Sequence, residues 1–269
     1  MIRLIASDID GTLVPDGTDQ INTDIYEAIR RLSDKGIIFV GASGRQYASI
    51  RRLFRPVSDM IYYVTDGGGM VIHDGAILAS VPIETSVVHE LAEDILSIPE
   101  CDVMLCGEKS TYAPDAGSRM FHWLKDDYHF DIVEKKDLYA PLDDKIVKVS
   151  LYHPADAEGV AKRSGFTDKW KNRVKVSCAG SQWMDCMHPE ANKGTALKKI
   201  QEKLGITSEE TMTFGDNIND IEMLAQSAFS YAVGNARDEV KRTARYMADT
   251  NVNDGVLKEL NKLLGQLEA

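Results

Sequence analysis

The sequence has few cysteines and histidines, and it lacks the long apolar runs of membrane spans. Its 269 residues include four cysteines and six histidines, and these form no CxxC, HxH or HExxH pattern of the sort that binds zinc. We expect the cysteines to be small buried thiols in a reducing compartment. They are Cys101, Cys106, Cys178 and Cys186. No apolar run approaches the roughly 18 residues of a membrane span, so we expect a cytoplasmic protein.

The sequence also has fewer basic than acidic residues. Lys and Arg number 31 against 42 Asp and Glu, which gives a formal net charge of −11. An acidic chain repels nucleic acid and anionic lipid, so we expect neither as a partner. The arginine-rich stretch Arg51, Arg52 and Arg55 is interpreted as a solvated helix face.

Strand and helix signals alternate in the first and last thirds of the chain. Apolar runs at residues 2–7, 37–42 and 61–65 lack polar alternation, as strands buried on both faces of a parallel sheet do. From Asn192 onward the spacing predicts further alternating elements. These are a helix ending at Gly205, a strand over 211–214, a helix over 221–228, and strands over 229–233 and 246–248. Both ends of the chain are therefore predicted to build one doubly wound, mostly parallel Rossmann-like α/β sheet.

The middle of the chain has a different pattern and is interpreted as an inserted α+β domain. The domain is predicted over residues 83–187, and residues 1–82 and 188–269 would form the α/β core. A helix is predicted over 85–97, and residues 146–152 alternate as a strand exposed on one side should.

Two carboxylates follow the first predicted strand, in the segment Asp8-Ile9-Asp10-Gly11-Thr12-Leu13. They can face the same side if the backbone stays extended, and Gly11 allows a sharp turn afterwards. A calcium loop starting at Asp8 is excluded, because its sixth position is Leu13 instead of Gly and its twelfth is not Glu. From these residues alone, a simple turn with a helix-capping acid remains open.

Three further groups could assist an anion or a cation. Ser43, Gly44 and Arg45 follow the second strand and offer a hydroxyl, an approachable backbone and a planar cation to a phosphate, although such turns also occur without a ligand. Lys193 begins a predicted helix, where the macrodipole disfavours a cation, so either solvent or a nearby anion must account for it.

The third group lies where the strand over 211–214 gives way to a helix. Asp216 and Asp220 either favour the helix dipole or complete a Mg²⁺ site with Asp8 and Asp10. The sequence alone leaves both readings open.

In this order, and separated by a long insertion, the four segments resemble the motifs of the haloacid dehalogenase (HAD) superfamily. DIDGTL resembles the first motif, the Ser43 segment the second, Lys193 the third and GDNIND the fourth. The insertion begins after a TDGGG segment and resembles the large α/β cap of the Cof-type phosphatase group. The resemblance spans nearly the whole chain. It implies a Mg²⁺-dependent hydrolase of a small phosphorylated metabolite, such as a sugar or cofactor phosphate, acting through an aspartyl-phosphate.

The alternatives are a phosphomutase of the same superfamily and a non-enzymatic sensor of a phosphorylated ligand. For any of these we expect a monomer or a weak homodimer.

The resemblance also implies a role for each motif residue. Asp8 would be the nucleophile and Asp10 the general acid and base, assisted by Ser43 and Lys193. Mg²⁺ would bind the residues with carboxylate or carbonyl oxygens, namely Asp8, Asp10, Asp216 and Asp220, the last of which could instead orient metal waters or Lys193. Phosphate would be bound by the residues with N–H groups or polar side chains, namely Gly11, Thr12, Ser43, Gly44, Arg45, Lys193 and Asn219.

The chain departs from the family pattern at Asp66, where the family commonly has Asn, and at Ser43, which replaces the more frequent Thr. Asp66 would either alter phosphate binding or substrate choice, or cap a turn. The insertion would choose the leaving group, although for each of its candidate residues a surface or core role is favoured over substrate contact. They are Arg119, His122, Lys125, Trp183 and Asp185.

Overall fold

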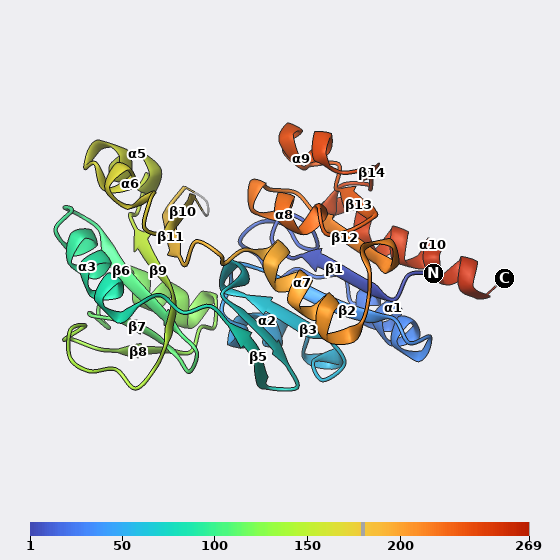
Figure 1. Cartoon of the computed structure of the whole chain (residues 1–269), viewed down its shortest axis with the longest axis horizontal. Coiled ribbons are helices and arrows are strands. Elements are labelled where there is room, and N and C mark those ends of the chain that lie inside the picture. Colours follow the sequence, from blue (N-terminus) through green and yellow to red (C-terminus); the bar gives the residue numbers. More distant parts are fainter. Residues whose placement is uncertain (179–180, 269) are drawn as a thin grey trace. The chain divides into compact units, whose positions relative to one another are not determined.

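A computed structural model describes residues 1–178 and 181–268 of the chain. These residues form two compact units. The first unit comprises Met1–Ser43, Ile50–Ala79 and Asn192–Ala269, and the second comprises Gly44–Ser49 and Ser80–Ala191. The two ends of the chain, blue and red in Figure 1, thus belong to the same unit.

These ranges differ in detail from the predicted insertion over 83–187, because residues 44–49 group with the second unit. Residues 179, 180 and 269, which fall inside the predicted domains, lie outside the described residues. The assignment of the two units as separate domains stays a prediction.

The first unit contains an eight-stranded sheet in the order β14-β13-β12-β1-β2-β3-β4-β5. Its strands are β1 (Leu4–Asp8), β2 (Ile38–Ala42), β3 (Tyr62–Thr65), β4 (Met70–His73), β5 (Ala76–Ser80), β12 (Thr211–Gly215), β13 (Phe229–Ala232) and β14 (Tyr246–Met247). All pairs from β14 to β3 are parallel, and β4 returns antiparallel to β3. β1 lies at the centre, and every one of its residues is buried. The predicted doubly wound α/β sheet is confirmed.

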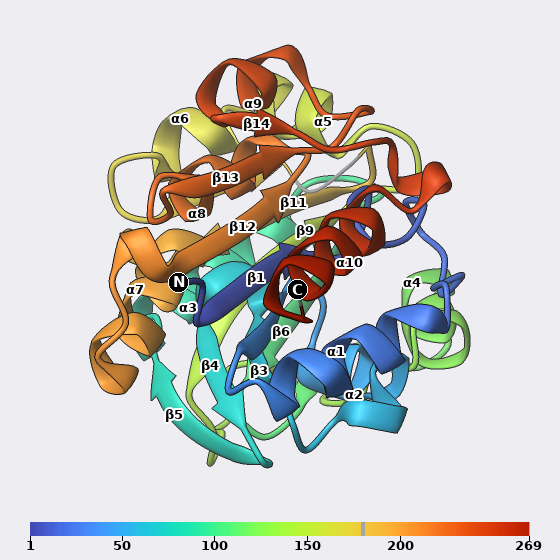
Figure 2. The ribbon, with the colours of Figure 1, turned by 90° about the vertical axis from the view of Figure 1, so that its right-hand side faces the viewer.

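Helices cover both faces of this sheet (Figure 2). α1 (Asp24–Asp34) and α10 (Gly255–Glu268) contact each other on one face. On the other face, Leu197 and Ile200 of α7 (Lys193–Leu204) pack against Leu4 and Val40. Apolar residues at helical spacing therefore bury the strands of the first unit from both sides. Further helices with residues in this unit are α2 (Tyr47–Leu53), α8 (Ile221–Leu224) and α9 (Asp238–Thr243).

The predicted helix over 221–228 is too long, because α8 ends at Leu224. The amides of Gln226 and Ser227 donate to carbonyls three residues back, which tightens and ends the last turn. The hydroxyl of Ser227 then donates to the Thr211 carbonyl at 2.9 Å, which fixes the chain for its entry into β13.

The second unit is an α+β layer structure, as predicted. Its sheet has the order β10-β11-β9-β6-β7-β8. The strands are β6 (Asp102–Gly107), β7 (Thr111–Ala113), β8 (Ile132–Glu134), β9 (Ile146–Tyr152), β10 (Lys175–Cys178) and β11 (Trp183–Met187). The helices include α3 (Thr85–Leu96), α4 (Arg119–His122), α5 (Ala157–Arg163) and α6 (Phe166–Trp170). Leu91 of α3 packs with Val149 and Leu151 of β9 in the larger of its cores.

The prediction that residues 146–152 form a strand exposed on one side is wrong, since all seven residues of β9 are buried. The polar residues of the alternation do not face solvent because they contact Asp185 of the neighbouring strand. The Ser150 hydroxyl donates to Asp185 at 2.6 Å, and the Lys148 ammonium lies 3.7 Å from the same carboxylate. Polar alternation in this strand thus marks an internal ion pair.

One cysteine also departs from expectation. Cys101, Cys106 and Cys186 are buried free thiols, whereas Cys178 is exposed. Cys178 is the last residue of β10, and β10 is an edge strand of the sheet in the second unit.

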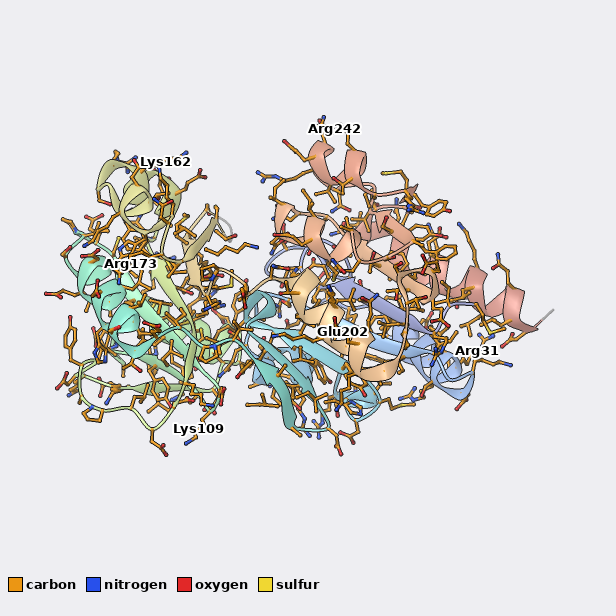
Figure 3. The ribbon with its side chains drawn as sticks, in the orientation of Figure 1. Arg31, Lys109, Lys162, Arg173, Glu202 and Arg242 are labelled. Atoms are coloured by element: carbon orange, nitrogen blue, oxygen red, sulfur yellow. The ribbon has the colours of Figure 1, made fainter. Side chains whose placement is uncertain are left out.

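The arginines of the stretch 51–55 are exposed, as predicted. Several labelled cations in Figure 3 pair with neighbouring acids on the surfaces of the units. Arg31 lies 2.8 Å from Glu268, Arg173 lies 2.6 Å from Glu90, and Lys109 lies 2.9 Å from Asp143. Such exposed pairs contribute little to stability. Among the described residues, the helices are all too short or too polar to cross a membrane.

Candidate active site

The turn after β1 is shaped to bring its backbone against Asp216. Gly11 has a φ of +82°, and its N–H donates to the Val14 carbonyl at 2.8 Å. A side chain at Gly11 would be strained at this φ, and its Cβ would lie 2.5 Å from an oxygen of Asp216. Only glycine therefore allows the turn to pass this close to the carboxylate. The neighbouring Thr12 hydroxyl donates to Asp216 at 2.8 Å.

Lys193 is held among carboxylates at the first position of α7. Asn192 caps this helix by accepting a hydrogen bond from the Thr195 N–H at 2.8 Å, and the Thr195 hydroxyl accepts from the Asn192 N–H. The side chain of Lys193 is 1% exposed, and its ammonium donates to Asp8 and, at 2.6 Å, to Asp220. Nearby anions, and not solvent, therefore account for a cation at this helix start.

Asp220 binds groups from two parts of the cluster. One of its oxygens accepts from Lys193, and the other accepts the backbone N–H groups of Asp216 and Asn217 at 3.0 and 3.1 Å. Its side chain is fully buried. This carboxylate consequently fixes both the lysine and the loop that carries Asp216.

One carboxylate oxygen from each of Asp8, Asp216 and Asp220 lies within 4.8 Å of the others. Burial raises the pKa of Asp8 well above its ordinary value, the charge of Asp220 adds to this rise, and Lys193 opposes it. Burial, followed by the charge of Asp220, raises the pKa of Asp216 to about 6. Burial alone would lower the pKa of Lys193, but the charges of Asp220 and Asp8 outweigh it and raise that pKa, so the ammonium persists.

Three carboxylates therefore face one ammonium, and two negative charges remain unbalanced when all of them are ionised. A divalent cation would neutralise this excess, and carboxylate oxygens are the ligands that Mg²⁺ prefers. The residues present thus fit the cation that the sequence implies.

Ser43 joins the second motif to Asp10. It follows β2, where its N–H donates to the Val64 carbonyl at 2.9 Å and its carbonyl accepts from the Gly67 N–H at 3.0 Å. Its hydroxyl donates to Asp10 at 3.3 Å. Backbone bonds on both sides of the residue therefore aim this hydroxyl at the Asp10 carboxylate.

The other predicted phosphate ligands lie in varied surroundings. Gly44 and Arg45 group with the second unit, where the Gly44 carbonyl accepts from Lys148 at 2.7 Å. The buried Arg45 guanidinium lies 5.1 Å from the centre of the Tyr128 ring. Asn219 has a buried side-chain oxygen with no hydrogen-bond partner among residues 1–178 and 181–268. Phosphate binding by these residues stays a prediction.

Asp66 begins the short turn Asp66–Gly68, which follows β3, and it is completely buried. Its φ is +51°, a left-handed conformation that Asp and Asn adopt more readily than other non-glycine residues. Its carbonyl accepts from the Gly69 N–H at 3.2 Å. The backbone therefore favours the turn-forming explanation for an acid at this position.

The candidate leaving-group residues of the second unit fall into two sets. Arg119, His122 and Lys125 are exposed. Trp183 is half-buried and stacks with Trp123 at 5.9 Å between ring centres, while Asp185 is buried against Ser150. Substrate contact by any of them stays untested.

The sequence reasoning overlooked Asn235, whose amide donates to the Gly11 carbonyl at 2.7 Å. The residue lies in the loop after β13, preceded by a glycine. A Gly-Asn pair after a strand is typical of any turn, so the sequence offered no sign of this contact.

Comparison with known proteins identifies the architecture. A family model described as haloacid dehalogenase-like hydrolase matches residues 5–260. A 5-amino-6-(5-phospho-D-ribitylamino)uracil phosphatase of Escherichia coli is 29% identical over 263 residues, covering 98% of this chain and 96% of that protein. A Bacillus subtilis phosphatase of the same description is 29% identical over 265 residues, covering 96% and 94%.

Solved structures agree. A crystal structure from Eubacterium rectale superposes with a TM-score of 0.88 at 37% identity, covering 97% of this chain and 99% of that one. A sugar phosphatase of HAD subclass IIB has a TM-score of 0.80 at 23% identity, covering 97% and 98%, and supports the fold alone. The chain therefore belongs to the haloacid dehalogenase-like hydrolases, as a HAD-type phosphatase of the Cof-type group.

Proposed function

We propose that the chain is a Mg²⁺-dependent phosphomonoester hydrolase that works through an aspartyl-phosphate on Asp8. The observation that carries the proposal is the cluster of buried Asp8 and Asp220 and half-buried Asp216 around the ammonium of Lys193. A cluster with two unbalanced negative charges is costly to bury. Its presence is explained if it binds a divalent cation together with a phosphate.

In this proposal Asp8 attacks the phosphorus atom of the substrate and forms a covalent acyl phosphate. Lys193 binds one Asp8 oxygen, which orients the carboxylate and offsets repulsion between it and the incoming anion. Asp10 gives its proton to the departing alcohol and then accepts one from the water that hydrolyses the intermediate. The Ser43 hydroxyl, which donates to Asp10, positions this acid.

Mg²⁺ would be held by the carboxylates of Asp8 and Asp216 and by the backbone carbonyl of Asp10. When bound, the ion supplies positive charge that stabilises the transferring phosphoryl group. Asp220 would remain outside this set, because both of its oxygens already bind Lys193 and backbone amides. Its task is to orient the lysine and the Asp216 loop.

The substrate is proposed to be a small phosphorylated metabolite. The Escherichia coli and Bacillus subtilis relatives are named for 5-amino-6-(5-phospho-D-ribitylamino)uracil. This polyol phosphate is therefore the first compound to test on this chain, followed by sugar phosphates and cofactor phosphates. We expect the protein to act in the cytoplasm, as a monomer or a weak homodimer.

The test is a panel of such phosphate esters with inorganic phosphate as the readout, in Mg²⁺ and in EDTA. We expect metal-dependent release from at least one ester without any added sugar bisphosphate. Release that requires a bisphosphate activator would instead indicate a phosphomutase. Binding of an ester without turnover would indicate a sensor and contradict the proposal.

A further inference from the structure

Two asparagines near the C-terminus hold the turn that follows the proposed nucleophile. The side-chain amide of Asn235 donates to the Gly11 carbonyl at 2.7 Å, and its oxygen accepts from the Asn251 N–H at 2.9 Å. The Asn251 side chain in turn donates to the Val14 carbonyl at 3.4 Å. The turn of residues 11–14 is thus bonded at both ends to the chain segment that follows β13.

The loop that carries Asn235 is itself fixed to the Asp216 loop. The N–H of Arg237 donates to the Asp216 carbonyl at 2.9 Å, and that of Gly234 donates to the Asp249 carbonyl at 3.2 Å. A Cβ on Gly234 would lie 2.9 Å from the methyl group of Thr250, so the two backbones approach closely. Asn235 is therefore presented from a rigid support, as a positioning group requires.

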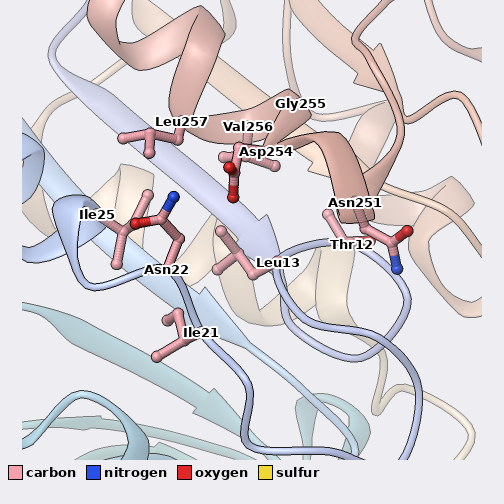
Figure 4. Close-up of a pocket in the computed structure, with 10 residues that line it drawn as sticks. All are labelled: Thr12, Leu13, Ile21, Asn22, Ile25, Asn251, Asp254, Gly255, Val256 and Leu257. Carbon is pink, nitrogen blue, oxygen red and sulfur yellow. The ribbon is translucent and has the colours of Figure 1, made fainter.

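A small pocket lies beside the turn. Thr12 and Asn251 both line a pocket that is bordered by residues 12–25 and 251–257 (Figure 4). Thr12 and Val14 are themselves buried, so the turn is packed as well as hydrogen-bonded. The polar contacts of Asn235 and Asn251 are thus direct links between the turn and the C-terminal segment.

We infer that Asn235 is a positioning residue for phosphoryl transfer, and this rests on the function proposed above. A trans peptide is planar, so a hydrogen bond that fixes the Gly11 carbonyl also orients the rest of the Gly11–Thr12 peptide, whose N–H donates to the Ile9 carbonyl at 3.2 Å. The backbone of Gly11 also continues directly from Asp10, whose carbonyl is a proposed metal ligand. The turn is closed by its own backbone bonds, and Asn235 reinforces it from outside, next to the proposed phosphate and Mg²⁺ ligands.

The amide is suited to this task because it donates and accepts at the same time. An ionised aspartate of the same shape can still accept from Asn251, but it cannot donate to Gly11 and would place a negative charge against that carbonyl. The substitution Asn235→Asp therefore separates the hydrogen bond to the turn from the volume of the side chain.

The experiment compares Asn235→Asp and Asn235→Ala with the wild-type chain and with Asn253→Ala. Asn253 is an exposed amide of the same segment that donates to Asp249 at 3.2 Å, so it serves as a matched control. The measurements are kcat and KM for an aryl phosphate, the Mg²⁺ concentration for half-maximal activity, and the Mg²⁺-induced rise in Tm without substrate.

We expect both Asn235 variants to lose about 10–100-fold in kcat, as removal of groups that orient metal ligands commonly does. The Mg²⁺ requirement should rise and the Mg²⁺-induced gain in Tm should shrink, while Asn253→Ala matches wild type. If Asn235→Ala does not fold, Asn235→Asp decides the question, with its activity expressed per folded molecule by circular dichroism.

Wild-type kcat and Mg²⁺ dependence in Asn235→Asp would overturn the inference while leaving the proposed function intact. A loss of activity that only follows a loss of folded protein would overturn it too. An inactive wild-type chain, by contrast, would contradict the proposed function itself.

Discussion

Replacing Asp216 by Asn should stabilise the metal-free protein at alkaline pH while removing its phosphatase activity. The carboxylate is crowded by Asp8 and Asp220, and burial raises its pKa from 3.8 to about 6. An amide removes the charge but keeps an oxygen that can accept from the Thr12 hydroxyl. The substitution therefore relieves repulsion without breaking the contact that fixes the turn.

The size and pH range of the gain follow from proton linkage. The unfolded chain releases the Asp216 proton near pH 3.8 and the folded chain near pH 6, so the folded state binds more protons between these values. The free energy of unfolding therefore falls as pH rises through this range. A shift of about two units corresponds to at most about 3 kcal/mol, and because the side chain is only partly buried we expect about 1–3 kcal/mol at pH 8.

The assay is urea unfolding followed by circular dichroism in EDTA, at pH 8 and at pH 4. Asp216→Asn should be more stable than wild type at pH 8, with the difference shrinking toward pH 4. The control Asp127→Asn removes the same charge from an exposed position and should change stability by less than about 0.5 kcal/mol. A variant no more stable than wild type at pH 8, or a gain that ignores pH, would refute the electrostatic reasoning.

Three further outcomes are expected. Asp8→Asn should lower kcat by at least about 10⁴-fold with an unchanged circular dichroism spectrum, since the nucleophile is lost; wild-type kcat in that variant would remove the covalent route. Activity measured by phosphate release should vanish in EDTA and return with Mg²⁺, whereas recovery with monovalent salt alone would argue against a metal site. Gly68→Ala should lower both Tm and kcat, because Gly68 has a φ of +105° and its Cβ would overlap the backbone of Asn192, next to Lys193. Unchanged thermal melting and kinetics would show that this backbone can yield.

The sequence predicts β1, β2, β3, β12, β13 and β14 of the first unit, but not β4 and β5. Apolar runs without polar alternation predicted β1, β2 and β3 to within two residues at each end. A lysine at a helix start left solvent and a nearby anion as open explanations, and the structure places Asp8 and Asp220 there. An apolar run and a lysine at a helix start each involve only neighbouring residues, so the order of residue types in the sequence reveals them.

Contacts between distant loops were beyond this kind of reasoning. Asn235 binds a backbone carbonyl 224 positions away, and any residue type at Gly11 would have provided that carbonyl. The buried state of β9 was missed for a related reason, since Lys148 looks like a surface residue until Asp185 is placed beside it. Hydrogen bonds to main-chain atoms and ion pairs across strands leave no periodic trace in a sequence.

The position of β1 has a consequence for synthesis of the chain on the ribosome. β1 pairs on one side with β2, which follows soon after it, and on the other with β12, whose residues emerge about 200 positions later. Until then one edge of the central strand has no partner, and an unpaired apolar edge is prone to join other chains. Premature termination before Thr211 should therefore yield aggregates, because it leaves this edge open.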